Sequence, residues 1–309
     1  MNAIETRGLT RKFGRIEAVR DLDLNVEEGR IYGFLGPNGA GKSTTINMLM
    51  GFVKPHGGEA SVLGHDIRTE HDEIRKLVGY LPERPPFYES LSGAANMRYF
   101  GRLIGIEDLD SRVMTLMKQV GLEGRERDKV RAYSHGMRQR LGIAIALLGQ
   151  PKLLIMDEPT TGLDPQGSHD IREIIMRLKG EHVTIFLSSH ILHEVQEVCD
   201  VVGIVKSGHM IVEKPIGSFI ESTKGGRARF EVCSAAMGEA YADVARKVKG
   251  VEDAGIRDGR LYLTVAEPAV AEDVNGALVG AGLRVREIKE ITPTLEEAFL
   301  KVVGEPQEG

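Results

Sequence analysis

Residues 36–44 read GPNGAGKST, a glycine-rich stretch that ends in a lysine and two hydroxyl side chains. Four of its residues fit the phosphate-loop pattern G-x-x-x-x-G-K-[ST], namely Gly36, Gly41, Lys42 and Ser43. Glycines let backbone N–H groups turn toward phosphate oxygens, a lysine reaches the β and γ phosphates, and a serine hydroxyl can hold Mg²⁺. The stretch therefore predicts a binding site for a polyphosphate.

The residues on either side of this loop predict the secondary structure that such a site needs. RIYGFLG (30–36) predicts a strand that runs into the loop, and KSTTINMLM (42–50) predicts a helix that leaves it. The positive end of that helix adds to the attraction for phosphate. A chance glycine-rich turn is the alternative in a chain with 37 glycines, and the strand–loop–helix order argues against it.

Composition restricts the class of protein. The chain has 309 residues, 41% hydrophobic and 28% charged, which is typical of a globular protein with one large and one small domain. Its net charge of −5 gives no basic footprint for nucleic acid. The start MNAIETRGLT lacks a signal-peptide pattern, and the longest apolar run, LGIAIALLG (141–149), is about half the length of a membrane helix. We therefore expect a cytoplasmic chain that reaches a membrane only through a partner.

The hydrophobic pattern predicts an α/β fold for residues 1–220. Alternating apolar residues predict an N-terminal antiparallel part; they are Val19, Leu22, Leu24 and Val26. Short apolar strands at 153–156, 183–187 and 201–205 alternate with helices, which indicates a largely parallel sheet. Between about 84 and 150 the pattern is mostly helical, so we expect an inserted helical subdomain there.

After residue 220 the pattern of polar and apolar residues changes. ESTKGGRAR (221–229) is polar and contains glycine, which predicts a linker. From 230 to 309, strands such as RFEVC and RLYLTV alternate with two helical stripes, in the order βαββ or βαβ and then αβ. We expect a small α+β domain of split βαβ type, with an accessory or regulatory role because it has no cluster of catalytic residue types.

Three further motifs contain residues that can act on phosphate. LLIMDEP (153–159) is an apolar strand that ends in Asp157, which can bind Mg²⁺, and Glu158, which can polarise an attacking water. Ser134 precedes a helix whose N-terminus could face the γ-phosphate of another subunit, and His190 ends the strand in FLSSH as a possible donor to a γ-phosphate. Each has a structural alternative: a solvated strand end, a simple N-cap and a surface histidine.

In this order the motifs resemble those of the ATP-binding subunits of ABC transporters, over residues of about 4 to 215. GPNGAGKST resembles the Walker A motif, YSHGMRQR a variant signature motif, LLIMDEP the Walker B motif and TGLD (161–164) the D-loop. His190 matches the switch histidine, and Phe13 stands where the family stacks an aromatic ring on adenine. The variant signature, GYLPE and TPTLEEAFL resemble the drug- and antibiotic-export branch.

The resemblance implies a role for each matching residue. ATP would contact the aromatic ring and the whole phosphate loop, namely Phe13, Gly36, Pro37, Asn38, Gly39, Ala40, Gly41, Lys42, Ser43 and Thr44. Mg²⁺ would be held by Ser43, Asp157 and Glu83, and Glu158 and His190 would act in hydrolysis. The dimer interface and the ATP bound by the partner would be contacted by Ser134, His135, Gly136, Met137 and Asp164.

The sequence departs from the family pattern at three of these positions. Glu83 stands where glutamine is usual; a carboxylate can coordinate Mg²⁺ but cannot donate a hydrogen bond. His135 and Met137 replace the common glycine and glutamine of the signature motif, which leaves Ser134 and Gly136 as its expected phosphate contacts.

The resemblance implies an ATPase that forms a homodimer, or pairs with a similar subunit, and powers a separate membrane permease from the cytoplasmic side. The cargo would be a drug, antibiotic, lipid or similar small molecule, and no nucleic acid is expected. A soluble ABC ATPase on ribosomes or DNA is the alternative, but such proteins usually contain two cassettes or a long coiled coil. A P-loop kinase or GTPase would not explain YSHGMRQR or TGLD.

The segment ERPPFYESLS (83–92) is the predicted docking site for the membrane partner. Pro85 and Pro86 stiffen it against helix formation, and Phe87 and Tyr88 place two aromatic rings among polar residues in a chain with 5% aromatics. The alternative is that both rings pack onto the helical subdomain.

Overall fold

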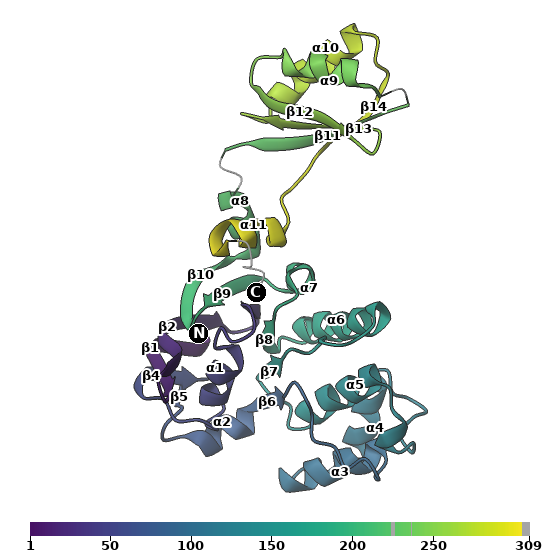
Figure 1. Cartoon of the computed structure of the whole chain (residues 1–309). Coiled ribbons are helices and arrows are strands. Elements are labelled where there is room, and N and C mark those ends of the chain that lie inside the picture. Colours follow the sequence, from purple (N-terminus) through teal and green to yellow (C-terminus); the bar gives the residue numbers. More distant parts are fainter. Residues whose placement is uncertain (224–225, 236, 305–309) are drawn as a thin grey trace. The chain divides into compact units, whose positions relative to one another are not determined.

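The structure is a computed structural model, and it describes residues 1–223, 226–235 and 237–304 (Figure 1). Contacts divide the chain into two compact units, Met1–Ile216 and Gly217–Gly309. In the described part of the chain, no helix is long and apolar enough to cross a membrane.

A six-stranded sheet forms the centre of the first unit. Its strand order is β10-β9-β3-β8-β7-β6, and every neighbouring pair is parallel except β10 with β9. The strands are β3 (Ile31–Leu35), β6 (Val78–Leu81), β7 (Leu153–Asp157), β8 (Thr184–Ser189), β9 (Val201–Lys206) and β10 (His209–Pro215). The predicted parallel core is confirmed. Since Leu35 pairs with Ser189 and Asp157 with Ser188, the ends of β3, β7 and β8 meet at one edge of this sheet.

A second sheet forms the predicted antiparallel part. Its order is β2-β1-β4-β5, and its strands are β1 (Asn2–Phe13), β2 (Ile16–Glu27), β4 (Gly57–Val62) and β5 (His65–Asp66). The alternating apolar residues of β2 are buried, as their spacing predicts. They share one hydrophobic cluster with Phe34 and Phe186 of the central sheet, whose ring centroids lie 5.3 Å apart.

Seven α-helices of seven to sixteen residues and a short 3-10 helix (Val130–Ala132) complete the described part of the first unit. Those beside the central sheet are α1 (Lys42–Leu49), α2 (His71–Leu77), α6 (Pro165–Gly180) and α7 (Leu192–Val198). The helical group consists of α3 (Gly93–Leu103), α4 (Leu109–Gln119) and α5 (His135–Ala146), which lie together in Figure 1. Residues 83–92 are a loop between β6 and α3, so the helices of the expected subdomain begin only at Gly93.

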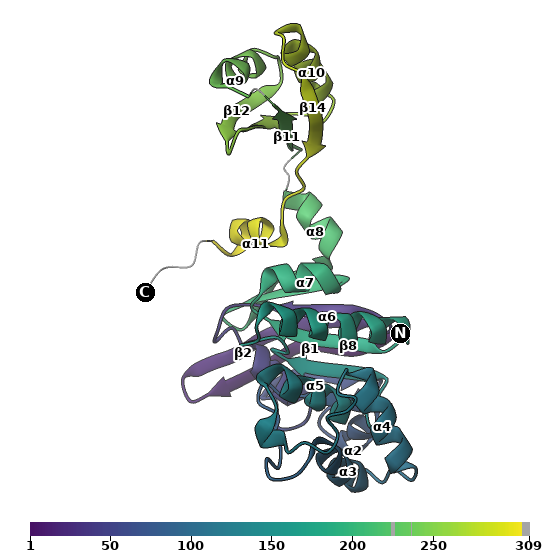
Figure 2. The ribbon, with the colours of Figure 1, turned by 90° about the vertical axis from the view of Figure 1, so that its right-hand side faces the viewer.

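The second unit contains a four-stranded antiparallel sheet of order β12-β13-β11-β14. Its elements follow the order βαββαβ: β11 (Ala228–Ser234), α9 (Glu239–Arg246), β12 (Val251–Arg257), β13 (Arg260–Val265), α10 (Val270–Gly280) and β14 (Val285–Glu290). Both helices lie on one face of the sheet (Figure 2) and share its hydrophobic cluster. The split βαβ prediction is confirmed, in the variant with two strands between the helices.

The segment 221–229, expected as a linker, differs in the structure. Helix α8 (Ile216–Thr223) extends into it, and the hydroxyls of Ser222 and Thr223 at its end donate to carbonyl oxygens one turn earlier. At the other end, Arg229 already pairs with Thr264 in the sheet. Residues 224–225 of this segment lie outside the described residues, as do 236 and 305–309 of the predicted C-terminal domain. The last helix of the described chain is α11 (Leu295–Val303).

Candidate functional site

A pocket of about 450 Å³ lies where the phosphate loop leaves β3. One wall is the loop itself, from Pro37 to Thr44. The other walls come from distant segments of the chain, through Ala18, Glu83, Glu158, Thr161 and His190. The structure therefore brings most of the predicted loop, two of the three predicted metal ligands (Ser43 and Glu83) and both predicted catalytic residues to a single pocket. Ala18 was not predicted from the sequence, and Thr161 was recognised there only as part of the D-loop motif, not as a residue of this site.

Two glycines of the loop are required by close backbone contacts. A Cβ on Gly36 would lie 2.4 Å from the carbonyl oxygen of Val205, and one on Gly41 would lie 2.3 Å from that of Ala18. Gly41 also has a φ of +104°, a conformation that other residues rarely adopt. These contacts place the loop tightly between β2 and the end of β9, so its N–H groups are held in a defined geometry.

Lys42, the first residue of α1, is almost fully buried. Its Nζ donates to the carbonyl oxygen of Gly36 at 2.7 Å and lies 3.1 Å from Oε1 of Glu158. The Lys42 side chain is 6% exposed and that of Glu158 10%. In a site so shielded from water, this cation and this carboxylate interact strongly.

Asp157 is the last residue of β7 and lies next to Ser43 of the phosphate loop. Its Oδ1 is 3.3 Å from the hydroxyl of Ser43 and accepts a hydrogen bond of 2.5 Å from the hydroxyl of Ser188. Ser188 Oγ in turn accepts a bond of 3.0 Å from the backbone N–H of Glu158. Ser188 was missed by the sequence analysis, although FLSSH contains it beside the predicted His190. It fixes the orientation of Asp157 toward Ser43.

Glu158 accepts hydrogen bonds from three sides. Besides Lys42 at Oε1, its Oε2 accepts from Thr161 Oγ1 at 3.0 Å and contacts His190 Nδ1 at 2.8 Å. Burial by itself raises the pKa of Glu158, but the charges and hydrogen bonds of Lys42 and His190 outweigh this and hold the pKa below its ordinary value. The φ of Glu158 is +50°, a strained conformation of the kind found at functional sites.

The loop after Glu158 is anchored by a buried hydrogen bond to Glu194, which also forms an ion pair. Thr160 Oγ1 donates to Oε2 of Glu194 on α7, and Oε1 of Glu194 lies 3.5 Å from Arg172 on α6. Thr160 and Glu194 are both buried. The strained turn at Glu158 is therefore anchored to two helices.

His190 reaches the pocket from the end of β8. Because a carboxylate only accepts hydrogen bonds, Nδ1 carries the hydrogen in its contact with Glu158. Its other nitrogen, Nε2, is then a donor only if the ring is doubly protonated. His190 can thus donate to a phosphate as an imidazolium that is balanced by Glu158.

Two other residues expected at the site differ in their relation to the pocket. Glu83 is exposed and lines the pocket. Phe13, at the end of β1, is 47% exposed and is not among the lining residues. Its ring lies against the guanidinium of Arg11, 4.5 Å from the ring centroid.

Apart from Thr161, which begins the D-loop motif, the residues of the signature and D-loop motifs do not line this pocket. Ser134 caps α5 by accepting from the N–H of Met137, and Asp164 caps α6 by accepting from the N–H of Gly167. Both caps are exposed, as is His135, whose Nε2 lies 3.1 Å from the carbonyl oxygen of Thr161. Gly136 packs 3.9 Å from Gly167, measured from its hypothetical Cβ. The N-terminal ends of α5 and α6 therefore form one exposed surface.

In the 83–92 loop, Tyr88 is 46% exposed and Phe87 is half-buried. The Tyr88 ring packs edge-on against Tyr99 of α3, with 4.7 Å between centroids and 3.0 Å between the hydroxyl oxygens. Its backbone N–H and carbonyl both bond to the amide of buried Asn96. Tyr88 thus rests on the helical group, as the alternative interpretation expects, while part of both tyrosine rings faces solvent.

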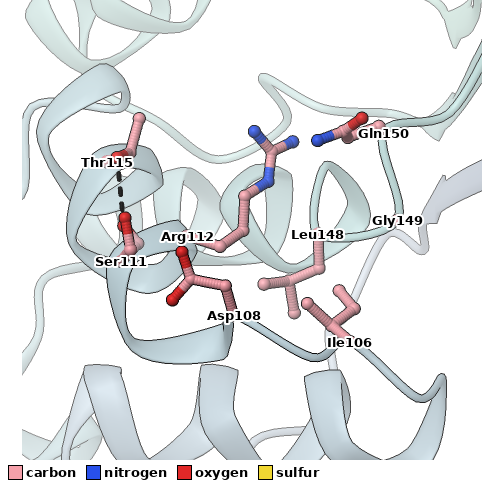
Figure 3. A pocket seen from close by; sticks show the side chains of 8 residues that line it. All are labelled: Ile106, Asp108, Ser111, Arg112, Thr115, Leu148, Gly149 and Gln150. Atoms are coloured by element: carbon pink, nitrogen blue, oxygen red, sulfur yellow. Dashed lines mark hydrogen bonds between the residues drawn. The ribbon is translucent and has the colours of Figure 1, made fainter.

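A second pocket, in the helical group, has a different character (Figure 3). It is lined by side chains of α4 and of the segment after α5, with Arg112 and Gln150 pointing toward each other (Figure 3). Arg112 Nη2 donates to the carbonyl oxygen of Leu147 at 2.7 Å, so the guanidinium joins α4 to the end of α5. With no glycine loop and no carboxylate pair among its lining residues, this pocket does not resemble the phosphate site.

Comparisons with known proteins agree with this geometry. The family described as ABC transporter matches residues 19–161. The bacitracin transport ATP-binding protein BcrA of Bacillus licheniformis is 36% identical over 302 residues, which cover 97% of each protein. The linearmycin resistance ATP-binding protein LnrL of Bacillus subtilis (strain 168) is 30% identical, covering 97% of this chain and 98% of LnrL. The chain belongs to the ATP-binding proteins of ABC transporters.

A solved ATP-binding subunit of an ABC transporter has the same fold, with 29% sequence identity and a TM-score of 0.65 over 72% of this chain and 93% of that one. As an ABC transporter ATP-binding protein, the chain binds nucleotide and hydrolyses ATP to power transport. The predicted family, fold class and ATPase activity are confirmed. The name of BcrA refers to transport and that of LnrL to antibiotic resistance, so the comparisons give no support to the ribosome- or DNA-associated alternative.

Proposed function

We propose that two copies of this chain, or this chain and a similar subunit, bind ATP between them and drive a separate membrane subunit. The complex would export an antibiotic or a similar small molecule, with this chain at the cytoplasmic face of the membrane. The names of BcrA and LnrL, which refer to bacitracin transport and linearmycin resistance, support this cargo class. The observation that carries the proposal is the contact of Glu158 with both Lys42 and His190 beside the phosphate loop.

In this proposal Glu158 is the general base. Phosphate oxygens of ATP attract Lys42 away from Glu158, which leaves Oε1 free to accept a hydrogen bond from water. The water oxygen attacks the γ-phosphorus while its proton passes to Glu158, and the bond to the β-phosphate oxygen breaks with its electrons on ADP. Lys42 and protonated His190 stabilise the negative charge on the phosphoryl oxygens.

Ser43 and Asp157 fit a magnesium site. Ser43 Oγ and Asp157 Oδ1, 3.3 Å apart, offer the oxygen ligands that Mg²⁺ prefers, and Mg²⁺ commonly takes one or two protein ligands together with phosphate oxygens. Bound Mg²⁺ would neutralise charge on the β and γ phosphates. Ser188 would keep Asp157 in position through its 2.5 Å hydrogen bond.

Glu83 is proposed as a ligand that links the metal to the 83–92 loop. Glu83→Ala should slow ATP turnover about three- to tenfold, the effect of about one charged hydrogen bond, with little change in nucleotide affinity. Steady-state ATPase assays and nucleotide titrations measure the two effects. Glu83→Gln, which restores the residue usual in the family, is the matched control and should retain turnover. Unchanged turnover in Glu83→Ala would remove Glu83 from the metal site.

The dimer part of the proposal is supported by the exposed surface at the ends of α5 and α6. Ser134 and Gly136 present a helix N-terminus that does not line the pocket of their own chain. In a pair of subunits, these residues with His135 and Met137 would face the ATP held by the partner's phosphate loop. Asp164 would lie at the same interface, and Phe13 would stack on the adenine of its own subunit's ATP.

The membrane subunit is proposed to dock on the 83–92 loop and the exposed part of α3. The tyrosine pair continues on α3 toward Leu103, which is 67% exposed and lies one turn beyond Tyr99. Because Glu83 lines the nucleotide pocket and begins this loop, ATP binding could move the docking surface directly.

The double variant Phe87→Ala/Tyr88→Ala tests this docking site. It should keep the basal ATPase rate of the isolated subunit, since neither ring lines the nucleotide pocket, but lose membrane association and transport. Sedimentation with native membranes and a transport assay provide the readouts. Met176→Ala, at an exposed position of α6, is the control for loss of a surface side chain. Normal assembly and transport by the double variant would place the docking site elsewhere.

Purification of the tagged chain from its native membranes tests the transporter assignment as a whole. We expect a protein with several membrane spans to copurify. Recovery of ribosomal proteins or DNA in its place would support the soluble alternative.

The second unit is proposed to have an accessory role, in dimer support or regulation. Its hydrophobic cluster is its own, and the residues that line the nucleotide pocket all belong to the first unit. A chain that ends after Ser222 should therefore bind ATP within about twofold of the full-length affinity. Fluorescent-nucleotide titration of the truncated and full-length chains measures this. Loss of nucleotide binding by a folded truncated chain, as judged by circular dichroism, would contradict it.

A further inference from the structure

His135, one of the departures from the family's usual signature sequence, contacts the loop that follows Glu158. It is the first residue of α5, and its Nε2 lies 3.1 Å from the carbonyl oxygen of Thr161. Because a carbonyl oxygen only accepts, Nε2 must carry the hydrogen in this bond. A glycine at this position, as is common in the family, has no side chain that could make the contact.

Thr161 in turn contacts Glu158. Its hydroxyl donates to Oε2 of Glu158 at 3.0 Å, and its side chain lines the nucleotide pocket. His135, Thr161 and Glu158 therefore form a continuous chain of two hydrogen bonds. These two hydrogen bonds connect the exposed end of α5 to the Glu158 carboxylate, which lies beside Lys42.

The segment between these contacts is a compact turn. The N–H of Thr161 bonds to the carbonyl of Glu158 at 3.3 Å, and the N–H of Leu163 bonds to that of Thr160 at 3.2 Å. The Thr160–Glu194 hydrogen bond anchors the turn to α7. Gly162, with a φ of +76°, lies directly beside the His135 ring; a Cβ there would be 3.7 Å from Nε2. A displacement at His135 would therefore reach Thr161 without being absorbed by a flexible loop.

We propose that His135 is a positioning residue that links the two ATP sites of the dimer. The inference rests on the proposed arrangement in which Ser134 and Gly136 contact the ATP bound by the partner. In that arrangement, ATP at one site sets the position of the α5 end, and His135 and Thr161 transmit this position to Glu158 of the other site. Each base is then held in its working orientation only when the opposite site is filled.

A double-mutant cycle tests the link. Steady-state ATPase kinetics are measured for the wild type, His135→Ala, Thr161→Val and the double variant. Each single variant should lower kcat about three- to tenfold, the effect of losing about one hydrogen bond, and reduce the Hill coefficient for ATP toward 1. The double variant should be no slower than the slower single variant, because both changes break the same chain. The KM for ATP should stay nearly constant.

Two further variants separate a positioning role from general effects. His135→Gln keeps an N–H donor of similar reach and should recover most of the wild-type kcat. His169→Ala, at an exposed position of α6, should leave kcat and the Hill coefficient unchanged. A double variant whose loss equals the product of the single losses, or a His135→Ala variant with wild-type kinetics, would overturn the link. A raised KM in His135→Ala would instead indicate that the ring contacts ATP itself.

Dimerisation distinguishes failure of this inference from failure of the proposed function. ATP-dependent dimer formation is measured by size-exclusion chromatography in the Glu158→Gln background, with and without His135→Ala. Dimers in both, together with additive kinetics, reject the link and leave the two-subunit arrangement intact. No ATP-dependent dimer in either background rejects the arrangement and the link together.

Discussion

Replacing Glu158 by glutamine is expected to slow ATP hydrolysis by about 100- to 10,000-fold, the usual contribution of a general base. Glutamine has nearly the same size and can still accept the hydrogen bonds of Thr161 and His190 through its one oxygen. Its amide cannot take a proton from water, however. ATP should therefore still bind, and the dimer closed on ATP should accumulate because hydrolysis no longer opens it.

Single-turnover hydrolysis, nucleotide titration and size-exclusion chromatography with ATP measure these three effects. Glu173→Gln, an exposed position on α6, provides the same chemical change away from the site and should hydrolyse ATP at the wild-type rate. If Glu158→Gln also hydrolysed ATP at that rate, another group would have to be the base. The strained backbone and low pKa of Glu158 would then need a different explanation.

Loss of Lys42 is expected to affect binding and turnover together. Lys42→Ala removes the buried cation that would contact the phosphates, so ATP affinity should fall about 10- to 100-fold, as expected for charged hydrogen bonds. Hydrolysis should fall below detection because the same cation stabilises charge on the transferred phosphoryl group. Glu158 would also lose its contact with the lysine and retain those with His190 and Thr161.

Fluorescent-nucleotide titration and a phosphate-release assay measure the two losses. Lys54→Ala is the control, because Lys54 is an exposed lysine outside the nucleotide pocket. Wild-type affinity in Lys42→Ala would mean that the backbone of the phosphate loop alone binds ATP. Comparison with Glu158→Gln then separates binding from chemistry, since only Lys42→Ala should lose both.

Local patterns in the sequence were enough to predict the phosphate loop and the main elements. GPNGAGKST works through its own backbone, and its glycines at 36 and 41 can be recognised because their role depends on the absence of a side chain. The alternation of apolar residues in β2 likewise indicates which face of that strand is buried. Where the hydrophobic pattern is weak, the sequence did not predict the element with certainty. Strand β12 lies at a sheet edge with only Ala254 fully buried, so the sequence left its existence open.

The contacts that complete the site were decided by tertiary structure. Ser43 and Asp157 are 114 positions apart, and only the order of the parallel strands brings them within 3.3 Å. The contacts of Ser188 with Asp157 and of Tyr88 with Tyr99 also depend on tertiary structure. A sequence pattern indicates that one face of an element is buried, but it does not indicate which segment packs against that face. Thr161 and His135 were recognised as motif positions, but their hydrogen bonds depend on how the turn after Glu158 packs against α5. The phosphate loop could be predicted because neighbouring residues determine its backbone conformation. The hydrogen-bond partners of its side chains depend on how the whole unit packs.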